Sequence, residues 1–580
     1  MLRTGLLVGL FALVACSQAT AVLDIDAGAG GSGLPLDKDG GYFPPFVGFG
    51  DGGLVGGGGD MDDPLPPAEW NCGDNCFLGI DVPGGEGAVN TAKTANDEPS
   101  AMGPEIVYPL ANSLHPLNLP EITVQWRTAT NANNTAFRVR IFSDASKTTR
   151  WDFVVACKDK EMAAAGLGPQ DDTECAATLP TGAWLALAKA NRGQRVQVVV
   201  TELGTQARSS KPLPFSFSPD PVRGGLYYWS TALMGTYRLV FGARKAVPFI
   251  TPESDTNRFM CGGCHAVSRD GRVIAFAAEQ AGYLTVSLTD DPKTKLIDPP
   301  AKPESNGHIT TLSPDGRLVM VSFGQNDAKG NGRIAVLNTD TGKEVAQLNP
   351  SVLGTPETRV FFPEWSPNGK EIVATLANQD ERPWSVNNGY IVVFPYNDGK
   401  FGAAQIVAPK EANAFHFYPT WSPDGKWIAF TSAPLLVKSY DNPQSRLRLV
   451  SRDGGTIYEL GNATQGKGKT STWPKFAPFQ QAGGQMMFIT YNTKIDYGVM
   501  LKNSATQDNA RPQLWMSAID LRNLGSGDPS LPPVWLPFQD IGQQNHLGYW
   551  TEKVACRKEG GAGCGEGEVC DNGQCGRVVN

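Results

Sequence analysis

The segment Trp421-Ser422-Pro423-Asp424-Gly425-Lys426-Trp427-Ile428-Ala429-Phe430 decides the fold, because its central turn recurs along the chain. Related tetrapeptides are Ser-Arg-Asp-Gly at 268–271, Ser-Pro-Asp-Gly at 313–316 and Ser-Pro-Asn-Gly at 366–369, and a degenerate Ala-Pro-Phe stands at 477–479. The four complete turns follow one another at intervals of 45, 53 and 56 residues. This is the period of four-stranded propeller blades with loop insertions.

The chemistry of the turn explains its residues. Proline presets φ at the second position, Asp or Asn tolerates the third, and glycine takes the left-handed conformation that resumes the strand. Alternating apolar residues flank the turns, as at 273–276 and 427–430. Strand-like segments at 226–230, 236–240 and 247–250 precede the first turn, and 547–554 follows the last blade. A blade built from both ends would close the ring and remove free sheet edges.

These repeats resemble the WD40-like (PD40) blades of TolB-type six-bladed β-propellers, over residues 220–554. The resemblance implies a six-bladed fold. It leaves the activity open, because propellers carry many unrelated functions. One function that it implies is a protein-binding scaffold in the cell envelope.

The N-terminus predicts export. Residues 1–15 have the form of a signal peptide, in which Arg3 precedes an apolar run that is too short for a stable membrane span. Leu13-Val14-Ala15-Cys16 resembles a bacterial lipobox, which implies cleavage before Cys16 and lipidation of its thiol; an ordinary secretory signal is the alternative. Under this resemblance Ser17 favours the outer membrane of a bacterium. The lipid would be the only membrane anchor.

Two regions separate the lipidation site from the propeller. Residues 16–98 are rich in Gly, Pro and Asp and predict a flexible tether. Residues 99–219 contain alternating runs at 122–126, 137–141 and 196–200. This pattern resembles an immunoglobulin-like or fibronectin-like β-sandwich, serving as a spacer or a binding module. The predicted fold class is therefore all-β.

The cysteines favour an oxidising compartment. Without Cys16, ten of the eleven remain. Cys157 and Cys175 flank one loop and are expected to close it with a disulfide, whereas Cys72 and Cys76 pair with each other or with the sandwich. Residues 555–580 resemble a small EGF-like or knottin-like appendage with two disulfides, a four-thiolate zinc site being the alternative. Its cysteines are Cys556, Cys564, Cys570 and Cys575.

The motif with the most specific chemistry is Cys261-Gly262-Gly263-Cys264-His265. C-x-x-C-H is the attachment signature of a c-type haem, in which two thioethers hold the porphyrin and the imidazole is the proximal iron ligand. The alternatives are a disulfide between the two cysteines and a thiol redox or metal site.

Four of the five histidines stand at or just before the start of an innermost blade strand, so we expect them on one face around the channel. A c-type haem usually takes a sixth ligand from His or Met. His546 in the closing blade is the predicted distal ligand and His308 in the second blade is the alternative. His416 in the fourth blade is a weaker candidate at the channel mouth.

Charge and missing motifs limit the remaining functions. The formal net charge of −8 and the absence of a basic stripe exclude a nucleic-acid partner. No nucleophile elbow, zinc-protease motif or phosphate loop occurs, so no catalytic residue is assigned. The sequence predicts electron transfer or redox sensing through haem c, with a protein or redox partner at the propeller face. Alternatives are a haem-free TolB-like scaffold and, more weakly, a cell-surface hydrolase.

Overall fold

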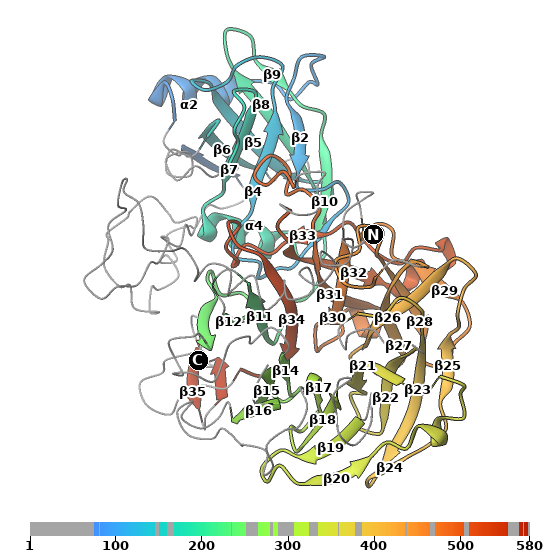
Figure 1. Ribbon diagram of the computed structural model, residues 1–580. Coiled ribbons are helices and arrows are strands. Elements are labelled where there is room, and N and C mark those ends of the chain that lie inside the picture. The colour runs from blue at the N-terminus through green and yellow to red at the C-terminus, as the bar shows by residue number, and fades with distance from the viewer. Residues whose placement is uncertain are drawn as a thin grey trace, which may run out of the picture.

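The computed structural model describes residues 75–79, 82–145, 150–158, 168–231, 233, 235–250, 265–278, 282–287, 307–323, 334–357, 359–377, 385–435, 438–464, 470–503, 510–554, 568–571 and 574–577. Strands dominate these ranges, with α-helices α2 (Gly85–Thr94) and α4 (Thr181–Ala190) and short 3-10 turns between them. Neither α-helix has the length and apolar character of a membrane span. Figure 1 shows a smaller body above a ring of sheets. The predicted all-β class is confirmed.

The smaller body is a β-sandwich. Its larger sheet has the order β1-β6-β5-β8-β10-β3, with β9 beside β8, and its smaller sheet has the order β2-β4-β7. The larger sheet consists of β1 (Asn75–Gly79), β3 (Leu114–His115), β5 (Ala136–Ser143), β6 (Arg150–Ala156), β8 (Arg195–Leu203), β9 (Arg208–Ser209) and β10 (Leu213–Phe217). The smaller sheet consists of β2 (Glu105–Tyr108), β4 (Thr123–Arg127) and β7 (Glu174–Thr178). Trp126 of β4 packs on Phe137 of β5 with ring centroids 5.0 Å apart, which joins the two sheets.

The sandwich begins earlier than residue 99, the boundary expected from the sequence. Strand β1 pairs in parallel with β6. The fully buried Arg138 of β5 donates hydrogen bonds to the carbonyls of Ala92 and Ala95, both 2.7 Å, at the end of α2. These bonds satisfy carbonyls that a helix end leaves unpaired. The segment that carries β1 and α2 therefore belongs to the folded body and not to the tether.

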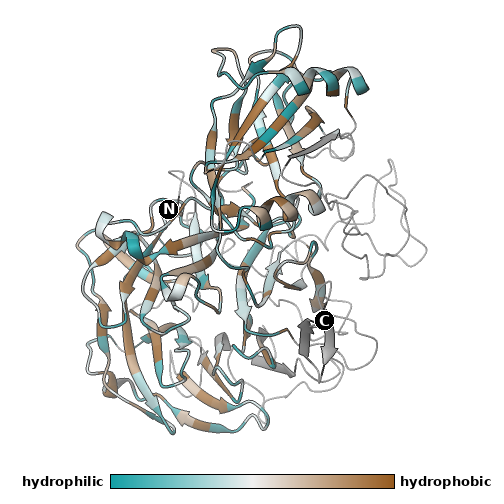
Figure 2. Ribbon diagram, turned by 180° about the vertical axis from the view of Figure 1, so that it is seen from behind, coloured by the Kyte–Doolittle hydropathy of each residue, from teal (hydrophilic) through white to brown (hydrophobic). Residues whose placement is uncertain are grey.

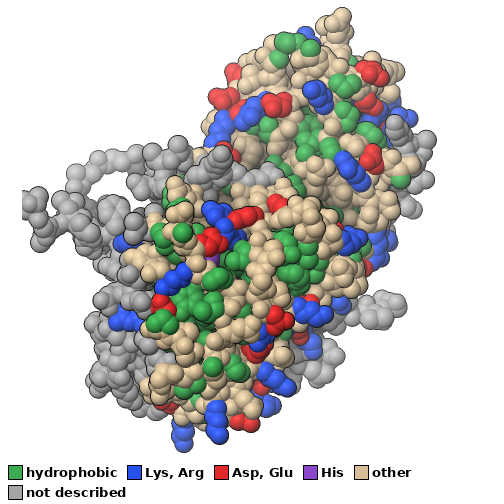
Figure 3. Space-filling view, turned by 90° about the vertical axis from the view of Figure 1, so that its right-hand side faces the viewer, with side chains coloured by type: hydrophobic (Ala, Val, Ile, Leu, Met, Phe, Trp, Pro, Cys, Tyr) green, Lys and Arg blue, Asp and Glu red, His purple; other side chains and the backbone are tan. Residues whose placement is uncertain are grey.

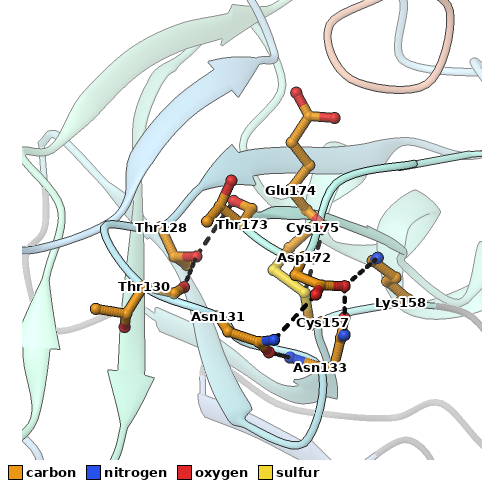
Figure 4. The surroundings of a disulfide bond; sticks show 10 residues. All are labelled: Thr128, Thr130, Asn131, Asn133, Cys157, Lys158, Asp172, Thr173, Glu174 and Cys175. Atoms are coloured by element: carbon orange, nitrogen blue, oxygen red, sulfur yellow. Dashed lines mark hydrogen bonds and ion pairs between the residues drawn. A yellow bond between two sulfur atoms is a disulfide. The ribbon is translucent and has the colours of Figure 1, made fainter.

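Cys157 and Cys175 form the disulfide expected between them, with an S–S distance of 2.05 Å. Beside it, Asp172 accepts hydrogen bonds from the side chains of Asn131 and Asn133 (Figure 4). Because these two thiols are consumed, neither is available to Cys72 or Cys76. Cys16, Cys72, Cys556 and Cys564 lie outside the described residues. Cys570 and Cys575 stand opposite each other in the hairpin of β35 (Glu568–Asp571) and β36 (Gln574–Arg577).

The ring consists of six described sheets, taken here in chain order from the blade that both chain ends build. The closing sheet holds β34 (Asn545–Thr551), β11 (Gly225–Ser230), β12 (Gly235–Val240) and β13 (Val247–Ile250). The next two hold β14 (His265–Val267), β15 (Val273–Ala278) and β16 (Gly282–Ser287), then β17 (Gly307–Leu312), β18 (Leu318–Phe323), β19 (Ile334–Asn338) and β20 (Glu344–Gln347). The sheet after these holds β21 (Arg359–Trp365), β22 (Glu371–Ala377), β23 (Gly389–Asn397), β24 (Lys400–Phe401) and β25 (Gln405–Ala408). The last two hold β26 (Ala414–Trp421), β27 (Trp427–Pro434), β28 (Arg446–Ser451) and β29 (Ile457–Glu459), then β30 (Ser471–Phe476), β31 (Met486–Thr493), β32 (Gln513–Asp520) and β33 (Val534–Trp535).

The first strands of these sheets form the inner wall of the ring. Each of these strands contacts the next one around the ring, in the order β34, β14, β17, β21, β26, β30. Strand β30 then contacts β34, which completes the circle. The closing sheet joins both chain ends, because Leu226 of β11 lies opposite Trp550 of β34. The predicted propeller is therefore confirmed, together with the expected closure by strands from both ends. On the flank in Figure 3, acidic and basic side chains alternate with hydrophobic ones.

The recurring turns adopt the expected geometry. The Ser422 hydroxyl donates to Asp424 Oδ1 at 2.6 Å and accepts the Trp427 N–H at 2.9 Å. Gly425 has φ +70°. The complete turns after β14, β17 and β21 repeat both the Ser-to-Asx bond and the left-handed glycine. A side chain other than glycine would be strained there.

The sandwich is fixed to the propeller by a shared buried core. Figure 2 shows that both bodies contain hydrophobic strands. The rings of Tyr497 and Trp535, both from the propeller, stack with centroids 4.3 Å apart, and Tyr108 of the sandwich meets Tyr497 edge-on at 4.9 Å. The Tyr108 hydroxyl accepts a hydrogen bond from the backbone N–H of Trp535 at 3.1 Å. Gln125 Oε1 accepts the backbone N–H of Val499 at 2.8 Å. The two bodies therefore share polar as well as apolar contacts.

We predict that Tyr108→Phe lowers the free energy of unfolding by about 1–3 kcal/mol, because it leaves the buried backbone N–H of Trp535 without its acceptor. Urea denaturation followed by tryptophan fluorescence measures this change. Tyr458→Phe, on the half-buried β29, is the control and should change stability by less than about 0.5 kcal/mol. Equal effects of the two variants would contradict the role given to this hydrogen bond.

A second prediction concerns acid stability. Burial among aromatic rings lowers the pKa of His115 from 6.5 to about 3. The folded protein therefore disfavours protonation, so the stability from neutral His115 is complete above pH 6.5 and is lost as the pH falls toward 3. His115→Gln should lose less stability than the wild type between pH 7 and pH 4 in urea titrations at each pH. A variant with the same acid sensitivity as the wild type would contradict this assignment.

Candidate functional site

The six innermost strands can be aligned on the residue that precedes each turn. In chain order these residues are Val267, Leu312, Trp365, Trp421, Phe476 and Trp550. Each position in this register recurs at an equivalent place around the channel, because the six strands line it in order. The register therefore shows which side chains from distant parts of the chain share one level of the channel.

Four blades share a backbone irregularity three residues before the aligned position. Phe362, Tyr418, Trp473 and Leu547 have φ values of +52°, +51°, +56° and +53°. The pairing register of each strand shifts at this point. Left-handed backbone is uncommon in bulky residues, and β-bulges redirect side chains and are frequent beside functional sites. The same bulge in four blades therefore marks the channel as the candidate site.

The first layer of redirected side chains is aromatic. Tyr418 and Trp473 stack with ring centroids 3.6 Å apart and an interplanar angle of 17°. Phe362 meets Tyr418 edge-on at 4.3 Å and Trp473 at 5.8 Å. Phe362 and Trp473 come from blades that the blade of β26 separates. Rings that meet across an intervening blade must project toward the channel axis.

The second layer, one residue before the aligned position, is polar. Lys475 forms an ion pair with Glu364, and its ammonium lies 4.5 Å from the centre of the Tyr549 ring. Glu364 Oε1 also accepts hydrogen bonds from the Thr420 hydroxyl at 2.7 Å and from the backbone N–H of Trp421 at 2.9 Å. Burial would lower the pKa of Lys475, but Glu364 and Tyr549 outweigh it and raise this pKa. The layer therefore holds a partly buried pair of opposite charges.

A pocket opens between this polar layer and the turns. The empty space at the pocket is about 640 Å³ when the open solvent at its mouth is included. All six blades contribute to its walls, which combine indole and proline rings with the Glu364–Lys475 pair. The lining residues are Ala266, Val267, Arg269, Thr311, Leu312, Pro314, Glu364, Trp365, Pro367, Thr420, Trp421, Lys475, Phe476, Pro478, Tyr549 and Trp550.

His265 is the described part of the predicted haem motif, since Cys261 and Cys264 lie outside the described residues. It is the first residue of β14 and is 2% exposed. Its ring contacts Tyr549, with centroids 5.2 Å apart. Tyr549 also lines the pocket, so one side chain touches both His265 and the pocket.

Strands β34 and β17, which carry His546 and His308, both contact β14. The structure therefore brings the three strands together as expected, and the assignment of a distal ligand stays a prediction. Burial and the nearby Lys494 lower the pKa of His546 to about 4. The side chain of His308 lies outside the described part of the chain.

His416 is enclosed inside its own blade, which corrects the expectation that it lies at the channel mouth. Its side chain is fully buried. Nδ1 lies 2.8 Å from the Ser432 hydroxyl, and Nε2 lies 3.1 Å from the Pro409 carbonyl, to which it can only donate. Because both ring nitrogens are engaged, His416 is not available as a ligand in this structure. Burial lowers its pKa to about 4.

Neither side-chain layer was expected from the sequence. The missing signal was the pair aromatic-Pro before the turn, which occurs at 362–363, 418–419 and 473–474. Within the described ranges no three His, Cys, Asp or Glu side chains gather in a way that could hold a metal ion.

No family model matches the chain. An uncharacterized protein of Agrobacterium fabrum (strain C58 / ATCC 33970), Atu1656, is 23% identical over 237 residues, which cover 39% of this chain and 65% of the relative. Among solved structures, TolB from Acinetobacter baumannii aligns with 60% of this chain and 80% of its own at 14% identity and a TM-score of 0.33. The dihydro-heme d1 dehydrogenase NirN aligns with 54% of each chain at 15% identity and a TM-score of 0.31.

We predict that Glu364→Gln destabilises the protein by about 1–3 kcal/mol, because it leaves the partly buried Lys475 without a carboxylate. Adding Lys475→Met should restore most of this loss, and urea denaturation of both variants measures it. Asp144→Asn is the control: its partner Arg195 and Asp144 are both about half exposed, so a change below about 1 kcal/mol is expected. If the double variant is less stable than Glu364→Gln alone, the ion pair is not the source of the effect.

Proposed function

We propose that this chain is an exported, lipid-anchored propeller protein that carries a covalently attached c-type haem and transfers electrons or senses a redox partner. Cys261 and Cys264 would form the thioethers, and His265 would be the proximal iron ligand. The observation that carries the proposal is the position of His265, which begins an innermost strand and is buried beside the channel. The motif thus leads directly into the channel wall.

The donor chemistry of the described residue fits a haem, because an imidazole is the axial ligand that a C-x-x-C-H motif supplies. When bound, a c-type haem supplies an iron centre that accepts and releases single electrons. Tyr549 packs edge-on against His265 and restricts the orientation of its ring. Lys475 in turn lies over the Tyr549 ring, so the charged layer supports the residue that packs on the imidazole.

The anchor and the partner follow from the same proposal. Cys16 would carry the lipid, and the Gly-rich residues after it would hold the folded bodies away from the outer membrane. The sandwich would not move independently, because it shares a buried core with the propeller. A redox partner would then approach the propeller face at a constant orientation to the sandwich.

A second candidate function is a haem-free, TolB-like scaffold that binds a protein. The pocket at the turn end of the channel favours it, because all six blades contribute to a concave site with aromatic walls and a few polar groups. In this case Cys261 and Cys264 would form a disulfide and the protein would be colourless.

Expression of the full chain in a host with cytochrome c maturation tests the haem. We expect a Soret band, haem staining that survives denaturing electrophoresis, and a tetrapyrrole adduct on the peptide that contains Cys261 and Cys264. Cys264→Ser should remove most of the colour, because one thioether is lost. Cys570→Ser with Cys575→Ser, which changes two cysteines of the hairpin β35–β36, should retain it. An unmodified peptide in the mature wild-type protein would overturn the haem and favour the scaffold.

The distal ligand is tested on the same protein. His546→Ala should change the spin state of the iron, seen in the absorption spectrum, while the covalent attachment persists. His416→Gln is the matched control, because the ring nitrogens of His416 are engaged inside its blade. An unaltered spectrum of the His546 variant would exclude it as the sixth ligand and leave His308 as the alternative.

A further inference from the structure

The rim of the turn-end pocket breaks the repeat at one position. The second residue of the turn is proline at 314, 367 and 423, and also in the degenerate copy at 478, but it is arginine at 269. Proline at this position presets the turn, so its replacement gives up a local preference. Arg269 therefore needs an explanation other than the geometry of its own turn.

Arg269 extends across the mouth of the channel. Its Nη2 donates hydrogen bonds to the carbonyls of Pro478 at 2.9 Å and Pro423 at 3.3 Å, and its Nε pairs with Glu552 at 2.6 Å. Pro423 follows β26, which lies opposite β14 in the ring of inner strands. The guanidinium is thus held over the pocket by three blades other than its own.

Arg269 keeps hydrogen-bonding capacity for a ligand. A guanidinium has five N–H donors in a planar fork, and Nη1 of Arg269 has no acceptor among the described residues. The side chain is 25% exposed and lines the pocket. The Nη1 donors are therefore available to an acceptor that enters the mouth.

Lys475 adds a second cation deeper in the same pocket. The carboxylate of its partner Glu364 also accepts hydrogen bonds from the Thr420 hydroxyl and the backbone N–H of Trp421. It therefore keeps two donors when the Lys475 ammonium binds a ligand. An ammonium has three N–H donors, so Lys475 can bond to Glu364 and to a ligand at the same time. The acidic groups at the pocket are thus satisfied by the protein, whereas both cations retain donors.

The walls around these two cations are flat and apolar. They include the rings of Trp365, Trp421, Phe476 and Trp550. The indole N–H groups of Trp421 and Trp550 are already engaged, by the Glu364 carbonyl and the Thr490 hydroxyl respectively. These two indoles therefore contribute their apolar rings to the walls.

We propose that the turn-end pocket binds a carboxylate carried on an aromatic or other flat apolar group. The carboxylate is bound by Arg269 Nη1 and Lys475, and the apolar group packs between the indole rings. The ligand is either a free aromatic acid or the C-terminus of a peptide with an aromatic last residue. The site does not depend on the haem, because none of these residues belongs to the C-x-x-C-H motif.

Arg269→Pro tests the proposal with little risk to the fold. It restores the residue of the other turns, and the backbone N–H of Arg269 donates no hydrogen bond to a described residue. The probes are phenylacetate and its uncharged analogue phenylacetamide, titrated into the full-length protein by calorimetry. We expect wild type to bind phenylacetate at least tenfold more tightly than phenylacetamide. Arg269→Pro should remove this preference.

Arg272→Ala is the matched control. Arg272 lies on the same turn but pairs with Asp270 and the Asp315 carbonyl and does not line the pocket, so this variant should retain the preference. Ala-Ala-Phe as the free acid and as the amide distinguishes the two sources of the carboxylate. Tighter binding of the peptide acid than of phenylacetate indicates a chain terminus, and the reverse indicates a free acid.

Three outcomes would overturn the proposal: equal binding of acid and amide, no saturable binding of either acid, or an unchanged preference in Arg269→Pro. The last would mean that Arg269 only ties the turns together, as its bonds to Pro423 and Pro478 already do. Because the assay needs no haem, its result is separate from the spectroscopic test of the proposed function.

Discussion

The pairing of β34 with β11 is the constraint on which the rest of the structure depends. It places Leu226 opposite Trp550 and joins the two ends of the propeller in one sheet. Without this pairing the ring would end in two open sheet edges, and the inner strands would not enclose a channel. Closure therefore has to precede any site inside the ring, whether for a haem or for a small ligand.

Closure also creates contacts of large sequence separation. Arg269 and Glu552 are 283 positions apart, yet they form an ion pair of 2.6 Å at the channel mouth. Tyr549 of the last inner strand packs on His265 of β14. The haem motif and the turn-end pocket thus meet at the same junction, where the last inner strand lies beside β14. A change of register in β34 would disturb both sites, because Tyr549 belongs to each.

The bulges place side chains in the channel at the cost of local backbone strain. Phe362, Tyr418 and Trp473 adopt left-handed backbone, which costs free energy for bulky side chains, of order 1–3 kcal/mol each. The mutual packing of the three rings and the ion pair one layer further along offset this cost. The bulges in the inner strands thus lie where side chains enter the channel, whereas the second and third strands of each blade pair without a register shift.

The sequence by itself determined the architecture, because turn chemistry is local. Ser-Pro-Asp-Gly sets the same backbone conformation wherever it occurs. The spacing of 45–56 residues between these turns indicates about four strands in each repeat. It also placed His265, His308 and His546 on neighbouring strands and paired Cys157 with Cys175. Only the tertiary structure decided which side chains enter the channel. A one-residue bulge reverses the direction of every side chain that follows, and the hydrogen bond from His416 to Pro409 joins β26 to the segment that precedes it, so neither can be read from alternation along a single strand.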